Sequence, residues 1–339
     1  MNKVIGGEFE IDLSNIKDSC NFGHSITFST GRAAFFHILK LLNSNYGYKK
    51  ILLPDYLCES IIDAVKKCRL QFDFYNVNFD LSINFESLNS IYSNDHIVLF
   101  INYFGCIDIE NNISIIRKSF SDACIISDNV QAYYAMNKLS KADFSFTSFR
   151  KTFPTPDGAF VNSLWKGLDI LTESNTFLAS KALGGILKFS ARNNDLNDHL
   201  YLNFFDEGEK NIDSSYFSPM SEFSKLIFSG LDLDKIAAVR RENAIFLLKG
   251  LREINVDPII ADIKNYVPLF VPIRIPNRDE VRRRMFLERI YLPVHWPNPK
   301  NLKLNRAGEL STSELSLIVD QRYSINDMEK VLNMLVKFL

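Results

Sequence analysis

The sequence predicts an α/β protein in which a mostly parallel sheet lies between helices. Short, continuously apolar segments alternate with segments of helical pattern along the first half of the chain. Such strands are typical of parallel sheets that are buried on both faces. The chain has 339 residues, of which 46% are hydrophobic and 28 are Phe, so it is long enough for a large, aromatic-rich core.

The alternation is clearest between residues 26 and 163. A helix is expected from Gly31 to Leu42, because an apolar stripe follows a good N-cap at Ser29 or Thr30. The other expected elements are strands at 51–53, 71–77, 97–101, 124–127, 144–147 and 159–161, and helices at 59–67 and 111–120.

After residue 162 the pattern changes, and helical segments dominate. We expect helices within 163–200 and at 221–230, 233–254, 278–289 and 324–338, strands at 265–274 and 290–294, and a loop at 203–219. The expected organisation is an N-terminal arm at 1–25, a large domain at 26–230 and a smaller C-terminal α+β domain at 231–339.

Composition excludes several classes of function. The net charge of −1 gives no basic excess for contacts with nucleic acid. No signal peptide and no apolar run that could span a membrane is visible, which favours a cytoplasmic protein. The five Cys form no C-x-x-C pair and the His residues no metal spacing, so neither a disulfide framework nor a metal site is indicated.

The stretch from Ser148 to Ala159 carries the strongest chemical signal. Lys151 lies in it, between Ser148 and a Pro/Asp/Gly turn, directly after an expected strand. A loop at a strand end places a side chain on a rigid scaffold, and a desolvated lysine can form a Schiff base. A single lysine is more often a solvated surface charge, so the inference depends on the rest of the chain.

Three other features are expected at the same edge of the sheet. The turn into a helix at Gly31 offers an anion site, and Asp128 ends an apolar strand, with Gln131 three residues further on. Taken alone, most helix starts bind nothing and Asp128 is better explained as an N-cap. A phosphate cradle, a buried aspartate and a lysine together are what pyridoxal phosphate (PLP) needs.

At these residues the sequence resembles the DegT/DnrJ-type aminotransferases of nucleotide sugars, which have the PLP transferase fold type I of aspartate aminotransferase. Asp128 to Ala132 matches the family's Asp-x-x-Gln-Ala, and Lys151 followed by Asp157-Gly158-Ala159 is similar to its lysine, five residues and Glu-Gly-Gly. The resemblance covers nearly the whole chain, with further similar segments at 31–34, 53–58, 101–105, 240–243 and 292–296.

The resemblance implies a role for each matching residue. Lys151 would carry the cofactor covalently, Asp128 would bind its pyridine nitrogen, and Gln131 would lie near its ring hydroxyl. The phosphate would be held by Ser148 and by the backbone at Gly31 and Arg32. Cys58 stands where the family has an aromatic ring that stacks on the cofactor, and Tyr56 is the candidate to replace that ring.

The implied activity is the PLP-dependent transfer of an amino group from glutamate to a keto group of a nucleotide-linked sugar, for polysaccharide or glycan precursors. The family also implies a homodimer with its active site at the interface. The chain departs from the family in the spacing between Ser148 and Lys151, which is three residues instead of five, in Asn102, which replaces a histidine, and in lacking the partner's Gly-x-Asn loop, near 218–221.

Other readings stay open at this point. A PLP-dependent sugar dehydratase or lyase would share the fold, although family members that dehydrate usually lack the lysine. A binding or regulatory protein that has lost turnover is a second alternative, motivated by Arg32 and Cys58. An unrelated nucleotide-binding α/β protein is disfavoured because no G-x-G-x-x-G follows a strand. The pair Arg240-Arg241 is expected on a solvated helix face, and His295 as a packed side chain.

Overall fold

The computed structural model describes residues 4–16, 22–23, 26–137, 140–163, 165–193, 198–297 and 307–339. Its largest feature is a seven-stranded sheet with the order β2 (Thr27–Phe28), β8 (Ala159–Ser163), β7 (Phe144–Phe146), β6 (Cys124–Asp128), β5 (His96–Ile101), β3 (Lys50–Pro54) and β4 (Gln71–Tyr75). The five strands from β7 to β4 are parallel, and β8 is antiparallel to both of its neighbours. The predicted mostly parallel sheet is confirmed.

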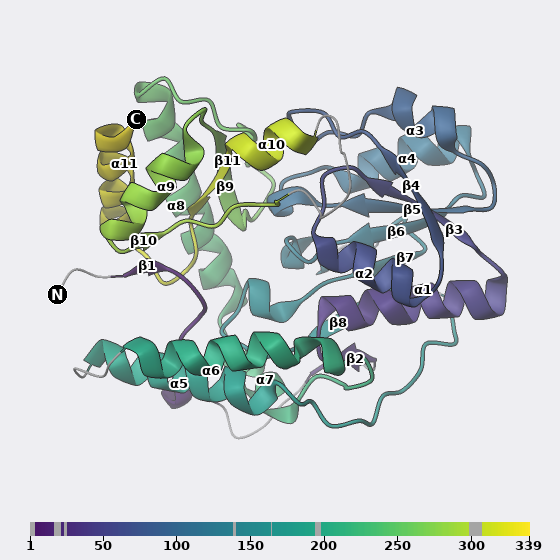
Figure 1. Cartoon of the computed structure of the whole chain (residues 1–339), viewed down its shortest axis with the longest axis horizontal. Coiled ribbons are helices and arrows are strands. Elements are labelled where there is room, and N and C mark those ends of the chain that lie inside the picture. Colours follow the sequence, from purple (N-terminus) through teal and green to yellow (C-terminus); the bar gives the residue numbers. More distant parts are fainter. Residues whose placement is uncertain are drawn as a thin grey trace.

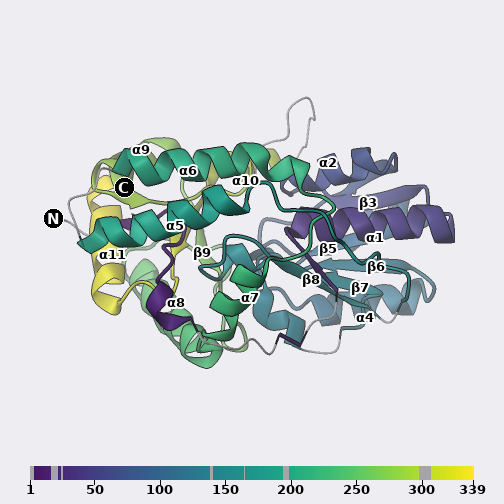
Figure 2. The ribbon, with the colours of Figure 1, turned by 90° about the horizontal axis from the view of Figure 1, so that it is seen from below.

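Helices cover both faces of this sheet. The helices α1 (Gly31–Tyr46) and α2 (Glu59–Lys67) lie on one face and α4 (Ile109–Ser119) on the other, while α3 (Phe85–Ile91) packs near β4 (Figure 1) (Figure 2). Every residue of β5 is buried, as a strand covered on both faces requires. Thr30 is the N-cap of α1, as predicted, and its hydroxyl accepts a hydrogen bond from Ala33 N at 3.0 Å.

Two long helices, α5 (Leu178–Asn193) and α6 (Asp198–Asn211), lie side by side below the sheet and are followed by α7 (Glu222–Ser229) (Figure 1). The prediction of a loop from residue 203 is therefore wrong as far as Asn211. Only Tyr201, Phe205 and Gly208 of α6 are buried, so polar residues dominate its sequence and conceal the helical stripe. Residues 165–177, expected to be helical, form no helix.

The C-terminal part contains a second, two-stranded antiparallel sheet. This sheet consists of β9 (Phe270–Arg274) and β11 (Glu314–Ile318). The other elements of the C-terminal part are α8 (Leu233–Glu253), α9 (Arg278–Leu287), β10 (Ile290–Tyr291), α10 (Ala307–Ser313) and α11 (Ile325–Phe338). The N-terminal strand β1 (Ile5–Gly6) pairs in parallel with β10. The segment predicted as an arm thus joins the C-terminal part, while the domain boundaries stay a prediction.

Polar side chains lie at the carboxyl edge of the large sheet, where β6 ends at Asp128 and β7 leads into Ser148. Within the residues that the structure describes, no helix combines the length and the apolar character that a membrane span needs.

Candidate active site

A cavity of about 670 Å³ opens at the carboxyl edge of the large sheet. Its walls come from the starts of α1 and α2, the ends of β6 and β7, the N-terminal segment at Gly7–Phe9 and the segment 290–296 of the C-terminal part. A volume of this size is typical of sites for small molecules. The structure brings Lys151, Asp128, Gln131, Ser148, Gly31, Arg32 and Cys58 together in its lining.

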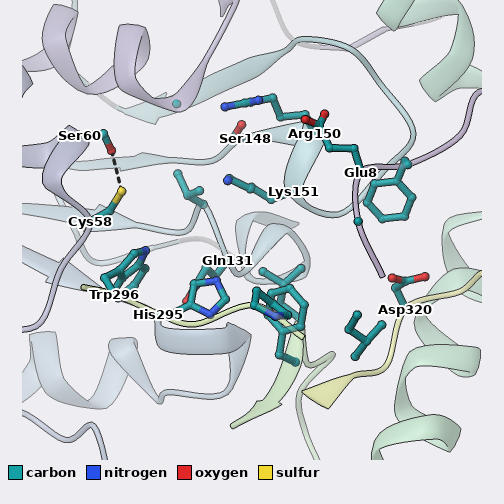
Figure 3. Close-up of a pocket in the computed structure, with 18 of the residues that line it drawn as sticks. Glu8, Cys58, Ser60, Gln131, Ser148, Arg150, Lys151, His295, Trp296 and Asp320 are labelled. Carbon is teal, nitrogen blue, oxygen red and sulfur yellow. Dashed lines mark hydrogen bonds between the residues drawn. The ribbon is translucent and has the colours of Figure 1, made fainter. Parts of the chain in front are cut away.

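Lys151 points into the middle of this cavity, between Ser148 and Arg150 on one side and Gln131 and His295 on the other (Figure 3). It ends a short 3₁₀ turn, η4 (Phe149–Lys151), that follows β7. The turn is anchored by Phe149 N, which donates to Gly158 O at 2.9 Å, and by the fully buried rings of Phe149 and Phe153. The backbone of Lys151 is therefore held from both sides.

Lys151 is exposed to the cavity, and the protein that forms the surrounding walls reduces the contact of its amine with bulk water. Burial, and then the nearby charge of Arg150, lowers the pKa of Lys151 below its ordinary value. The amine is therefore a better nucleophile and base near neutral pH than an ordinary lysine.

Asp128 is the last residue of β6, and its side chain is 6% exposed. Its Oδ1 accepts a hydrogen bond from Val130 N at 2.8 Å. Burial raises the pKa of Asp128 to about 7, although the bond from Val130 opposes this shift. No ion pair with a cation of the described residues stabilises the carboxylate. Such a buried acid is prepared for a ligand that brings its own positive charge.

The opposite end of the cavity is suited to an anion. Gly31 begins α1, and the helix start leaves backbone N–H groups at Gly31 and Arg32 without partners inside the helix. A Cβ on Gly31 would lie 2.9 Å from Val130 Cγ2 and 3.3 Å from Ser148 Cβ, so glycine permits this close approach. Ser148 is buried, and its hydroxyl makes no capping bond to η4. The side chain of Arg32 pairs with Asp213.

The remaining predicted residues lie along the walls. The Oε1 of Gln131 accepts a hydrogen bond from Phe104 N at 2.9 Å, and the Sγ of Cys58 accepts one from Ser60 Oγ at 3.1 Å. Tyr56 is not part of the lining. It lies behind the wall, with its ring centroid 5.3 Å from that of Trp296. Trp296 does line the cavity, and it is one of several aromatic residues of the wall that the sequence did not identify.

His295 lines the cavity as well as packing against its neighbours. Its Nδ1 lies 2.8 Å from Ser316 Oγ, and its backbone N donates to Glu314 Oε2 at 2.7 Å. Burial, and then the charge of Lys151, lowers the pKa of His295 to about 3. The imidazole is therefore neutral at physiological pH, and it can exchange a hydrogen bond with a ligand without adding charge.

The prediction that Arg240 lies on a solvated face is wrong. Arg240 is 1% exposed and lines the cavity, whereas Arg241 is exposed and its Nε donates to Tyr266 O at 3.0 Å. Consecutive helical residues point about 100° apart, so one of an adjacent pair can face the core while the other faces water. The apolar stripe of α8 distinguishes the two, because Arg240 lies on the same helical face as Ile236, Ala244 and Leu247.

Acidic residues at the cavity rim are paired with cations. Arg150 Nη1 lies 2.7 Å from Glu209 Oε1, and the buried Lys181 bridges Glu209 at 2.6 Å and Glu8 at 2.7 Å. The segment at 218–221 does not line the cavity, because Ser221 binds the buried carboxylate of Asp157 and Ser218 O accepts from Ser29 N. Among the described residues, no group of His, Cys, Asp and Glu side chains is arranged to hold a metal ion.

Comparison with known proteins adds the following. No protein-family model and no curated protein matches the sequence. The structure matches that of the sugar aminotransferase CalS13 from Micromonospora echinospora with 14% identity, 93% of this chain and 87% of that chain covered, and a TM-score of 0.67. The chain has the fold of the sugar aminotransferases.

Two further structures support this. A putative sugar aminotransferase, Spr1654 from Streptococcus pneumoniae, in its PLP form, matches at 12% identity over 92% of this chain and 86% of that one, with a TM-score of 0.67. A DegT DnrJ EryC1 StrS aminotransferase from Brucella abortus matches at 15% identity over 92% of this chain and 85% of that one, with a TM-score of 0.64. At these identities the likeness concerns the fold, and at that level the resemblance found in the sequence is confirmed.

Proposed function

We propose that this protein is a PLP-dependent aminotransferase that moves an amino group from glutamate to a keto group of a nucleotide-linked sugar. One observation carries the proposal. A buried Asp128 that pairs with no cation of the described residues and a cavity-facing Lys151 of lowered pKa share one cavity, whose other end is a helix start at Gly31. These residues suit the three ends of PLP, namely its ring nitrogen, its aldehyde and its phosphate.

The proposed roles follow from the position of each side chain. When bound, PLP supplies an aldehyde that carries the amino group and a ring that accepts electrons from the donor carbon. Asp128 would hold the ring nitrogen in its protonated form, because an adjacent positive charge returns the carboxylate to its ionised state. Ser148 and the backbone at Gly31 and Arg32 would bind the phosphate.

Lys151 has two tasks in this proposal. Its amine would bind the cofactor covalently between turnovers, and in its free, unprotonated form it would take the proton from the donor Cα and return it. Gln131 would lie near the ring hydroxyl. The neutral His295 and Trp296 would close the wall on the side of the C-terminal part and restrict the access of water.

The proposal also includes the setting that the family suggests. The protein would be a homodimer in the cytoplasm, and its product would serve the synthesis of polysaccharide or glycan precursors. The support is the match of fold with proteins described as sugar aminotransferases.

Adding PLP to the purified protein tests the proposal. The protein should turn yellow, and borohydride reduction followed by peptide mapping should place the cofactor on Lys151. A protein that stays colourless and carries no reduced cofactor after incubation with PLP would rule the proposal out.

An exposed arginine of the cavity wall is the proposed contact for the phosphates of the nucleotide-linked sugar. Arg282 lines the cavity from α9, is held by an Nε bond to Leu292 O at 2.9 Å, and has no carboxylate partner among the described residues. Arg282→Met should raise the KM for the nucleotide sugar by about 10–100-fold, the worth of a charge-assisted hydrogen bond.

The donor half-reaction, which needs no nucleotide sugar, should keep its rate in Arg282→Met. The matched control is Arg284→Met, which removes the same charge from α9 but breaks the pairing with Glu280 and the contact with the Phe338 ring, neither of which lies in the cavity wall. Steady-state kinetics with the sugar acceptor as the varied substrate check this prediction. An equal change in KM for both variants would contradict a direct contact by Arg282.

A further inference from the structure

The buried arginine of α8 is bound to backbone carbonyls instead of carboxylates. Arg240 Nη2 donates to Thr152 O at 3.1 Å, and Nη1 donates to Leu269 O at 3.3 Å and Pro268 O at 3.4 Å. A guanidinium that forms no ion pair with the described residues is costly to bury, although the nearby charge of Asp320 offsets part of this cost. The bond to the Thr152 carbonyl links Arg240 to the Lys151 turn, because Thr152 is the residue that directly follows Lys151.

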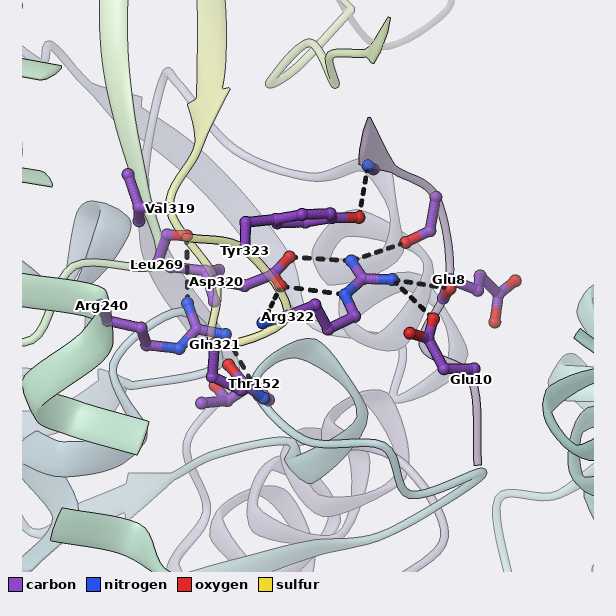
Figure 4. Close-up of polar contacts among 12 residues, drawn as sticks. Glu8, Glu10, Thr152, Arg240, Leu269, Val319, Asp320, Gln321, Arg322 and Tyr323 are labelled. Carbon is purple, nitrogen blue, oxygen red and sulfur yellow. Dashed lines mark hydrogen bonds and ion pairs between the residues drawn. The ribbon is translucent and has the colours of Figure 1, made fainter. Parts of the chain in front are cut away.

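The same carbonyl receives a second donor from the C-terminal part. Gln321 Nε2 donates to Thr152 O at 3.0 Å, so two side chains far apart in the sequence converge on one oxygen (Figure 4). On the other side of the turn, Thr152 N donates to Phe149 O at 3.0 Å. The two peptide groups that flank Thr152 are thus both held, the one shared with Lys151 through its N–H and the one shared with Phe153 through its carbonyl.

Gln321 directly precedes Arg322, which binds the N-terminal segment. Arg322 pairs with Asp320 at 2.8 Å, and it donates to Gly7 O at 3.1 Å and Glu8 O at 3.0 Å (Figure 4). The wall of the cavity formed by Gly7–Phe9, the end of β11 and the Lys151 turn are therefore parts of one hydrogen-bonded unit.

We propose that Arg240 and Gln321 are positioning residues for Lys151, which set the direction of its amine by holding the Thr152 carbonyl from the C-terminal part. The inference rests on the proposed function, since the lysine that Arg240 and Gln321 would position is the one that would bind PLP. Neither side chain needs to touch the cofactor. Their effect is geometric, because a displacement of about 1 Å at a reacting group can cost 100-fold in rate.

The test compares variants of the full-length protein by the rate at which PLP becomes covalently attached, measured by absorbance and borohydride trapping. Arg240→Met should slow the attachment about 10-fold or more, and Arg240→Lys, which keeps one donor, should recover part of that loss. Arg241→Met is the matched control, because it removes the same charge one residue away without a bond to Thr152.

Gln321→Met provides a second variant in case Arg240→Met fails to fold. It should slow attachment less than Arg240→Met does, and the double variant should lose more than the product of the single effects, because each donor partly replaces the other on the same oxygen. Amide hydrogen exchange across 149–153 should speed up in each variant, with or without PLP.

The outcomes separate the two proposals. If the unchanged protein attaches no PLP, the proposed function fails. Faster amide hydrogen exchange at 149–153 in Arg240→Met would still show that Arg240 holds the turn that contains Lys151. If the unchanged protein attaches PLP and Arg240→Met does so at the same rate with unaltered exchange, the positioning role is overturned. Equal slowing by Arg240→Met and Arg241→Met would overturn it too.

Discussion

Lys151→Met is expected to abolish covalent binding of PLP and to lower the transamination rate by about 10²–10⁴-fold or more, the usual worth of a positioned acid–base group. Methionine is unbranched and only one atom shorter than lysine, so the main change is the loss of the amine. Borohydride reduction should then leave no cofactor on the protein. Quantitative labelling and steady-state turnover measure both effects.

The same substitution should not weaken the fold. The folded protein lowers the pKa of Lys151, so at neutral pH the charged amine costs stability, and solvent in the cavity reduces this cost. The cost is absent above the ordinary lysine pKa of about 10.4, where the amine is neutral in the folded and unfolded states alike. Cofactor-free Lys151→Met should therefore unfold at the same or a higher urea concentration at pH 7. A large loss of stability would contradict the described environment of the amine.

Asp128→Asn is expected to change stability and cofactor affinity in opposite directions. The folded-state pKa of about 7 lies above the ordinary value of 3.8, so the cofactor-free protein should lose stability as pH rises from about 4 to about 7. Asparagine removes this slope and can still accept the bond from Val130 N. At pH 8 the cofactor-free variant should be more stable by about 1–3 kcal/mol, within the ceiling that three pKa units allow.

The affinity for PLP should fall in the same variant by roughly 10–100-fold, because the ring nitrogen loses its charged partner. Urea unfolding across the pH range checks the expected gain in stability, and equilibrium titration with PLP checks the expected loss of affinity. Asp320→Asn serves as a contrast, since Asp320 is buried but paired with Arg322, which lowers its pKa. That variant should be destabilised at pH 8. A loss of stability in both variants would show that Asp128 already has a cationic partner.

The features that the sequence predicts well depend on patterns within short stretches of consecutive residues. Continuous apolar strands identify the parallel sheet, and the residues that follow each strand must then meet at its carboxyl edge. For this reason the sequence alone predicts that Asp128, Lys151 and Gly31 lie near one another. The cap at Thr30 and the capping box that opens α11 at Ser324 are local patterns of the same kind.

The features that sequence missed depend on contacts between distant segments. Arg240 and Gln321 meet Thr152 across 88 and 169 residues of sequence, and no periodicity reports such a bond. Trp296 became a cavity wall because segment 290–296 packs against the sheet edge. The helix α6 was missed for a different reason, namely that it buries only a narrow stripe against α5.

Positions at which this chain departs from the family's pattern can be found in the cavity. Cys58 leaves the wall without the aromatic ring that the resemblance led us to expect there, and Trp296 lines the cavity from the C-terminal part instead. Arg32 and Arg150 are both paired with carboxylates, so neither is an unpaired cation for the phosphate. The proposed phosphate site therefore relies on backbone N–H groups and on Ser148.

The central claim is that the protein carries out transamination, and a single-turnover reaction with glutamate tests it most directly. Protein loaded with PLP should convert it to the aminated form and release one equivalent of 2-oxoglutarate when no acceptor is present. Lys151→Met should release none. If loaded protein holds PLP on Lys151 but yields no oxo acid from glutamate or any other amino donor, the assignment as an aminotransferase is contradicted.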